Sequence, residues 1–218
     1  MDFAHTYWKD QYSTNLAAHS RQNLAISKDF LAQSSVEVWS TLKKSTTMLE
    51  MGCGTGELSH SLFHKFNTLK DVLGLDISEE AIEYATAHYQ CSVIEETAIR
   101  SLKFKKYNFT AEPDLTKHFI PTDLIVCSNV LEHFKDPYSL LDKFLSLSRK
   151  VIVITPYQQP CTDGYDGEGG AGHVFTFDDD SFDAYQVVDK YTFSSGGWQF
   201  SSKGESPLQL VVLLEKKA

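Results

Sequence analysis

A glycine-rich segment, Glu50-Met51-Gly52-Cys53-Gly54-Thr55-Gly56, has the residue types of a ligand-binding loop. It follows a short apolar run and precedes a helical pattern, which places it between a strand and a helix. Glycines there allow a tight turn and a close approach of the backbone to a ligand. In the dinucleotide pattern GxGxxG the last glycine would stand at position 57, where this sequence has Glu57. The spacing therefore departs from that of a nicotinamide site, and a simple tight turn is the other alternative.

Two carboxylates flank this loop in the sequence. Glu50 precedes the first glycine by two residues, and Asp76 ends the next predicted strand, 20 residues after Gly56. A carboxylate at the end of that strand can accept hydrogen bonds from both hydroxyls of a ribose. The alternative for Asp76 is a simple helix cap.

With these residues the sequence resembles the class I S-adenosylmethionine-dependent methyltransferases, and in particular their small-molecule branch. The resemblance rests on the E-x-G-x-G-x-G segment, on Asp76, and on the run from Asp123 to His133 followed by Asp136-Pro137. It covers about residues 46–157 well and the two ends loosely. It implies S-adenosylmethionine as the methyl donor, S-adenosylhomocysteine as the product, and a small-molecule acceptor that is methylated on oxygen or nitrogen.

The resemblance also implies which residues contact the cofactor. They are Glu50, Gly52, Cys53, Gly54, Gly56, Asp76, Ile77, Asp114 and Asn129. The glycines would line the methionine moiety, Glu50 would face its ammonium group, and Asp76 would hold the ribose. Asn129 would lie beneath the methionine part. Asp114 is preferred to Glu112 as the acid that accepts a hydrogen bond from the adenine amino group.

Two histidines are candidates for contact with the acceptor. His173 follows a glycine-rich segment, residues 163–172, beyond the last clear predicted parallel strand, where ligands of open α/β sheets bind. A histidine there can take a proton from a hydroxyl or an amine, unless it only packs in the loop. His133 is the second candidate, and its alternative is a role at the start of the next helix. No metal site is expected, because the aspartates at 178–180 are interpreted as a solvated helix start.

Alternating strand and helix patterns must position these residues. Continuous apolar runs predict buried parallel strands at 48–51, 72–75, 123–128 and 151–154. Ser78 and Asp136-Pro137 are expected to begin helices. Four further segments are interpreted as a helix at 91–108, a helix around Phe182 and Tyr185 that begins at Thr176, and two closing strands at 198–200 and 208–214.

These patterns predict an α/β fold. We expect a Rossmann-like, seven-stranded, mostly parallel sheet with helices on both faces and a C-terminal antiparallel strand pair. Residues 1–218 are expected to form a single methyltransferase domain, with residues 1–45 as an N-terminal helical cover. The aromatic residues Tyr7, Trp8 and Tyr12 in this cover either face the cofactor's sulfonium or simply pack.

Composition limits the partners and the compartment. Acidic residues outnumber basic ones by 29 to 20, so the formal net charge of -9 argues against a nucleic-acid partner. The four cysteines form no CxxC pair, which favours a reduced, cytoplasmic protein. No apolar run approaches the ~20 residues of a membrane span, and no membrane partner is expected. We expect a monomer or homodimer. A protein or RNA methyltransferase and a non-catalytic regulatory protein that binds S-adenosylmethionine are the alternatives.

Overall fold

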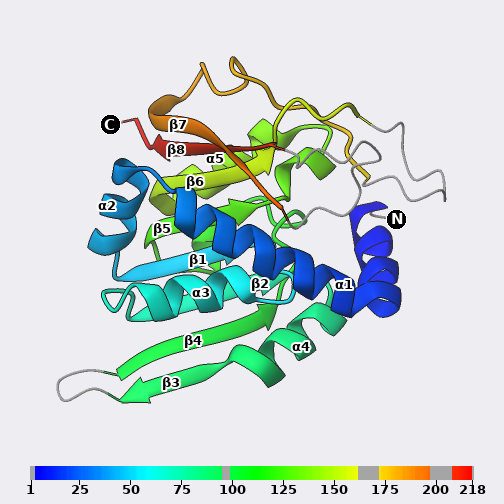
Figure 1. The fold of residues 1–218 in the computed structure, drawn as a ribbon, viewed down its shortest axis with the longest axis vertical. Coiled ribbons are helices and arrows are strands. Elements are labelled where there is room, and N and C mark those ends of the chain that lie inside the picture. The colour runs from blue at the N-terminus through cyan, green and yellow to red at the C-terminus, as the bar shows by residue number, and fades with distance from the viewer. Residues whose placement is uncertain (1–2, 95–98, 162–171, 197–207, 218) are drawn as a thin grey trace.

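The structure is a computed structural model that describes residues 3–94, 99–161, 172–196 and 208–217. Its strands are β1 (Thr47–Met51), β2 (Asp71–Asp76), β3 (Cys91–Ile94), β4 (Ile99–Lys106), β5 (Thr122–Ser128), β6 (Ser148–Pro156), β7 (Gln186–Ser194) and β8 (Leu208–Glu215). They form one sheet in the order β3-β4-β2-β1-β5-β6-β8-β7 (Figure 1).

The five central strands of this sheet are parallel. Strands β4, β2, β1, β5 and β6 run in one direction, so their carboxyl ends meet at one edge of the sheet. Strand β8 pairs antiparallel with β6, and β7 pairs antiparallel with β8. The predicted fold class is therefore confirmed, with eight strands among the described residues where seven were expected. The additional strand is β3, which pairs antiparallel with β4.

Helices cover both faces of the sheet. They are α1 (Phe3–Gln33), α2 (Val36–Lys44), α3 (Glu57–Lys65), α4 (Glu79–Tyr89) and α5 (Pro137–Leu147), with short 3-10 turns η1 (Leu115–Lys117) and η2 (Leu131–His133). Buried residues of α1 to α4 share one core with one side of the strands, and those of α5 share a second core with the other side. Within the described ranges, no helix combines the length and apolar character needed to cross a bilayer.

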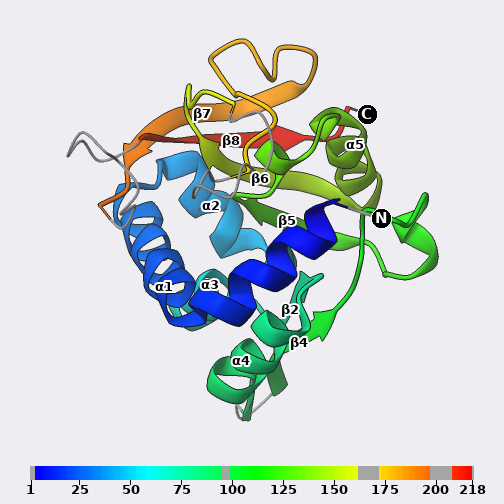
Figure 2. The same cartoon turned by 90° about the vertical axis from the view of Figure 1, so that its right-hand side faces the viewer.

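Helix α1 changes direction along its length. Asn15 departs from helical backbone angles, with φ −132° and ψ 26°, and divides α1 into two parts. Figures 1 and 2 show the second part lying along one face of the sheet, while the first part crosses the edge towards which β4 and β6 point. The chain's first helical turns therefore lie over the edge of the sheet where the glycine loop begins.

Residues 91–108 do not form the predicted helix. They contain β3 and β4, and in β4 the side chains of Leu102 and Phe104 are buried while those of Lys103 and Lys105 are exposed. This alternation with a period of two is typical of a strand with one buried face and one solvated face. The helix prediction was wrong because it did not take this alternation of apolar and charged residues into account.

The C-terminal region also differs from expectation. Residues 179–184 form turns instead of a helix, and the Asp178 carboxylate accepts hydrogen bonds from Ser181 Oγ (2.7 Å) and the Asp180 N–H (3.2 Å). These bonds close a tight polar turn, which competes with helix formation. The antiparallel partner of β8 is β7, residues 186–194, and the strand expected at 198–200 lies outside the described residues.

Candidate functional site

The glycine loop is tied to the end of strand β2. The N–H groups of Gly52 and Cys53 both donate to the Leu75 carbonyl oxygen, at 2.8 and 2.9 Å. The Gly54 N–H donates to Oδ2 of Asp76 at 2.8 Å. These three N–H groups are therefore engaged inside the protein, whereas a phosphate-binding loop directs such groups towards its ligand.

Gly52 and Gly54 are two of the positions in this loop that require glycine. Gly52 and Gly54 have positive φ angles of 76° and 51°, which side chains rarely adopt. A Cβ atom at Gly52 would lie 2.2 Å from Val130 Cγ2, and one at Gly54 would lie 2.5 Å from Tyr12 Oη. The loop is thus packed closely against the segment after β5 and against helix α1.

Three buried carboxyl groups surround the loop. Glu50 is 2% exposed and accepts a hydrogen bond from Ser59 Oγ on α3. Burial raises its pKa to about 8, and repulsion from Glu57 and Asp76 adds to this effect. Burial also raises the pKa of Asp76 and of Glu57. Since each negative charge costs free energy in this environment, the region around the loop favours a ligand that brings positive charge.

Helix α1 holds the loop from the other side. Ser20 Oγ donates to the Glu57 carboxylate at 2.5 Å, and Asn23 Nδ2 donates to Thr55 Oγ1 at 3.0 Å. Thr55 Oγ1 in turn donates to Glu57 at 2.6 Å. The spacing of the glycines did not indicate Glu57, Ser20 or Asn23 as part of this region. Glu57 stands where the dinucleotide pattern has its last glycine. This departure from the pattern is the sequence signal that could have indicated a role for Glu57 in this region.

Asp76 lies at the carboxyl end of β2 with both oxygens engaged. Oδ2 accepts from the Gly54 N–H, and Oδ1 accepts from the Ser78 N–H at 2.9 Å. The Ile77 N–H also hydrogen-bonds to this carboxylate, so three of its about four acceptor positions are used and one remains for a ligand. Ile77, the next residue, is half-buried between Asp76 and the N-cap Ser78.

Asn129 lies just beyond strand β5, at the same edge of the sheet as Glu50 on the neighbouring strand β1. Its φ of 53° is unusual for a residue other than glycine. Its Nδ2 donates to Ser128 Oγ at 3.1 Å, and its buried Oδ1 accepts no hydrogen bond among the described residues. A buried acceptor in this state suits a ligand that carries an N–H or O–H group.

Glu132, His133 and His173 form a second cluster on the same side of the molecule. His133 Nδ1 lies 3.2 Å from the Gly172 carbonyl oxygen, and its ring centroid lies 5.1 Å from that of His173. His173 is 3% exposed, so it does not stand free at the rim of the sheet. Burial lowers the pKa of His133 to about 3 and that of His173 to about 4, and it raises the pKa of Glu132 to about 8.

Aromatic side chains of α1 cover this second cluster. The Trp8 ring packs edge-on against the His133 ring with 4.8 Å between centroids, and it also contacts Tyr12 at 5.7 Å. Tyr12 itself is 7% exposed and contacts His19. One short helical segment therefore touches both the glycine loop and the histidine cluster.

Asp114 is placed differently from the other predicted site residues. It lies eight positions beyond the end of β4, in a turn where its carboxylate accepts from Thr116 N (3.0 Å) and Thr116 Oγ1 (2.6 Å). These bonds lower its pKa, and the side chain is 41% exposed. The carboxylate thus caps η1, and a ligand would have to compete with that role. The glycine-rich segment at 163–172 lies outside the described residues except for Gly172.

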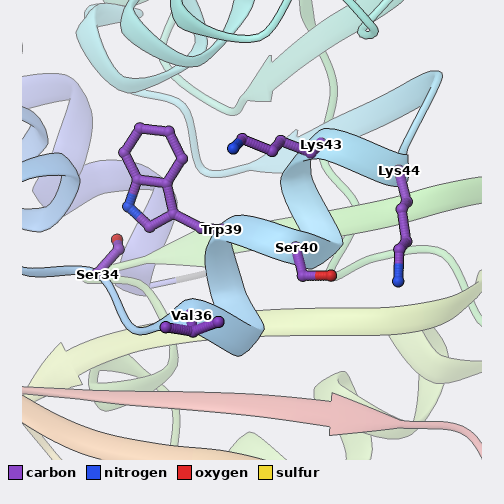
Figure 3. A pocket seen from close by; sticks show the side chains of 6 residues that line it. All are labelled: Ser34, Val36, Trp39, Ser40, Lys43 and Lys44. Atoms are coloured by element: carbon purple, nitrogen blue, oxygen red, sulfur yellow. The ribbon is translucent and has the colours of Figure 1, made fainter.

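A shallow surface depression occurs away from these groups. Figure 3 shows the six side chains that line it, which are Ser34, Val36, Trp39, Ser40, Lys43 and Lys44. They belong to α2 and the turn before it, at the amino-terminal end of β1 (Figure 1). The depression contains neither the buried carboxylates nor the histidines.

Known proteins resemble this chain in sequence and in fold. The profile of the methyltransferase-domain family matches residues 42–161. A ubiquinone biosynthesis O-methyltransferase of Hydrogenovibrio crunogenus is 31% identical over 139 residues, 63% of this chain and 49% of the relative. The mitochondrial ubiquinone biosynthesis O-methyltransferase of Saccharomyces cerevisiae is 31% identical over 109 residues, 50% of this chain and 32% of the relative. The matched part thus spans at most about half the length of these curated relatives.

A solved structure extends the likeness to nearly the whole fold. Magnesium protoporphyrin IX methyltransferase from Synechocystis PCC 6803, crystallised with bound SAH, superposes with a TM-score of 0.65. The two are 16% identical, and the alignment covers 97% of this chain and 99% of that one. The structural match shows the shared fold, and the sequence profile covers more than half of the chain. This chain belongs to the methyltransferase-domain family.

Proposed function

We propose that this chain is an S-adenosylmethionine-dependent methyltransferase that methylates an oxygen or nitrogen atom of a small molecule. The observation that carries the proposal is the pairing of a glycine loop with three buried carboxyl groups. A dinucleotide would bring a pyrophosphate next to Glu50, Glu57 and Asp76, whose raised pKa values show that further negative charge is unfavourable there. S-adenosylmethionine has no phosphate and instead brings an ammonium group and a sulfonium.

The residues around the loop fit this cofactor. Asp76 keeps an acceptor position for the ribose hydroxyls beside its three backbone donors, and Glu50 lies on β1 where it can face the ammonium group. Asn129 offers an unused acceptor at the edge between β5 and the loop. Gly52, Cys53, Gly54, Gly56 and Ile77 complete the proposed contacts. Asp114 is the proposed partner of the adenine amino group, if it can leave its turn.

The bound cofactor supplies a methyl group on a positively charged sulfur. The chain's task is then to hold the acceptor atom in line with that bond and to exclude water. We assign His173 and His133 to the acceptor side, because the His133 ring packs between Trp8 and the buried His173 ring. Their low pKa keeps both imidazoles neutral, so they can accept a hydrogen bond from a hydroxyl or amine and take the strongly acidic proton of a hydroxyl as it becomes methylated.

The nature of the acceptor is the less specific part of the proposal. The two relatives are named as O-methyltransferases of ubiquinone biosynthesis, which favours an oxygen acceptor on a small molecule. The alternatives are transfer to protein or RNA, and cofactor binding without catalysis. The net charge of -9 weighs against a large anionic substrate.

Calorimetry with S-adenosylhomocysteine, followed by a transfer assay with labelled donor, tests the proposal. We expect one binding site and label transfer to hydroxylated metabolites in a screen. Binding without transfer to any small molecule, peptide or RNA would support the regulatory alternative, and absence of binding would overturn the proposal. The expected cytoplasmic location and the monomeric or dimeric state belong to the same proposal. A reducing compartment suits the four free cysteines.

A further inference from the structure

Glu132, His133 and His173 bring three metal-ligating side chains together. One candidate ligand atom from each residue lies within 4.8 Å of the other two. Oε1 of Glu132 is 3.8 Å from Nε2 of His133. Ligand atoms about 2.1 Å from a common ion lie about 3–3.5 Å apart, so small side-chain rotations would complete the arrangement. We propose that these three residues bind a divalent first-row transition-metal ion.

The orientation of two of the three donors supports this site. His133 Nδ1 faces the Gly172 carbonyl oxygen at 3.2 Å, which fixes the ring and leaves the lone pair on Nε2. Histidine ligands of metals commonly donate their other N–H to a carbonyl group in this way. The two carboxylate oxygens of Glu132 are divided in the same way, one held by the protein and one left for the ion. Its Oε2 accepts from Thr155 Oγ1 at 3.3 Å, and its buried Oε1 has no hydrogen-bond partner among the described residues.

The backbone holds the two halves of the cluster in place. The Glu132 carbonyl oxygen accepts from the N–H groups of Val174 and Phe175, at 2.8 and 3.1 Å. These bonds join η2 to the segment that carries His173, although 40 positions separate His173 from His133 in the sequence. The site is thus supported by packed elements and does not depend on a flexible surface.

The donor set indicates the class of metal. Two imidazoles and one carboxylate suit zinc, cobalt, iron or manganese, whereas magnesium and calcium prefer oxygen ligands alone. Three protein donors also leave at least one coordination position open. An acceptor hydroxyl bound there would have a lowered pKa and would be activated for methyl transfer. This last step rests on the proposed function, whereas binding of the ion does not.

Cobalt(II) titration of the full chain after chelator treatment tests the site directly, by visible absorption and by calorimetry. We expect one ion per chain and absorption bands typical of nitrogen and oxygen ligation. Glu132→Gln and His173→Ala should each weaken binding by at least about 100-fold, since even loss of a supporting group commonly costs 10–100-fold. Circular dichroism without metal checks that both variants fold, and Glu132→Gln preserves side-chain volume.

His64→Ala is the matched control, because His60 and His64 form a second histidine pair on α3 with ring centroids 4.5 Å apart. This variant should bind the ion as tightly as the unaltered chain. If His64→Ala abolished binding while Glu132→Gln and His173→Ala did not, the proposal would be wrong. Equal binding by all variants, or binding of magnesium only, would also overturn it. Loss of cofactor binding with intact cobalt binding would contradict the proposed function alone.

Discussion

The glycine loop and the histidine cluster lie at the same side of the molecule but are assembled in different ways. The loop, Glu50 and Asp76 come from two adjacent parallel strands and their turns, within residues 50–78. The histidine cluster joins η2 to a segment 40 positions later through backbone hydrogen bonds. Local sequence therefore builds the region proposed for the cofactor, and long-range packing builds the region proposed for the acceptor.

This difference suggests a division of labour that substitutions can test. Changes in the loop should alter cofactor affinity, and changes in the histidine cluster should alter turnover at unchanged cofactor affinity. Helix α1 touches both regions through Tyr12 and Trp8, so it is where the two properties can become coupled.

The largest effect is expected for Gly54→Val. Its φ of 51° is unfavourable for a β-branched residue, and its Cβ would lie 2.5 Å from Tyr12 Oη. Binding of S-adenosylhomocysteine should fall below detection by calorimetry while circular dichroism stays near that of the unaltered chain. Gly196→Ala is the control, because a Cβ there meets no atom within 4 Å. Retained binding in Gly54→Val would place the cofactor elsewhere.

His173→Ala should lower turnover about 10²–10⁴-fold, the range expected for loss of a proton-transfer group. Its cofactor affinity should barely change, which calorimetry measures separately from the transfer assay. A raised KM for the acceptor with unchanged turnover would mean that His173 only anchors the loop. If turnover equals that of the unaltered chain, His173 is not the base. The base is then His133, or the mechanism has no protein base.

Asp76→Asn should weaken cofactor binding roughly 10- to 150-fold, equivalent to about 1.5–3 kcal/mol for one charge-assisted hydrogen bond. The amide keeps the shape of the side chain but loses the negative charge that ribose hydroxyls favour. Asp71→Asn, at the exposed start of the same strand, is the control and should bind normally. Equal affinity in both variants would remove Asp76 from the site.

The smallest effect is expected in the pH dependence of stability. The folded-state pKa of Glu50, about 8, lies above its unfolded value of about 4.5, so the folded chain binds the extra proton between these values. The associated stability is complete below about pH 4.5 and is lost as the pH rises through about 8. Glu50→Gln removes this titration and should gain about 1.4 kcal/mol relative to the unaltered chain from about pH 6 to 7.

Urea unfolding at the two pH values measures that difference. Glu37→Gln on α2 is the control, since its carboxylate is exposed. Parallel pH dependence of Glu50→Gln and the unaltered chain would contradict a strongly raised pKa at Glu50. It would also remove the electrostatic argument that the region around the glycine loop favours a cationic ligand.

Several elements could be predicted because their signals are local. The N-caps Ser78 and Asp136, with Pro137 in the first turn, begin helices as expected. Residues 91–108 and 176–185 were misread, because strand pairing and a turn closed by side chains overrode weak helical patterns. Strand β7 had no clear signal, since most of its side chains are exposed or half-buried at the edge of the sheet.

Local patterns in the sequence are sufficient to predict the turn from β1 to α3 and the position of Asp76. Parallel strands that follow one another in this fold end at one edge, so a local motif is enough to bring these residues together. The folded chain was needed to reveal that Ser20 of α1 holds Glu57, that Trp8 packs against His133, and that Glu132 lies close to His173. Such contacts depend on how distant segments pack, and the burial that shifts the pKa of Glu50 or Glu132 arises only after that packing.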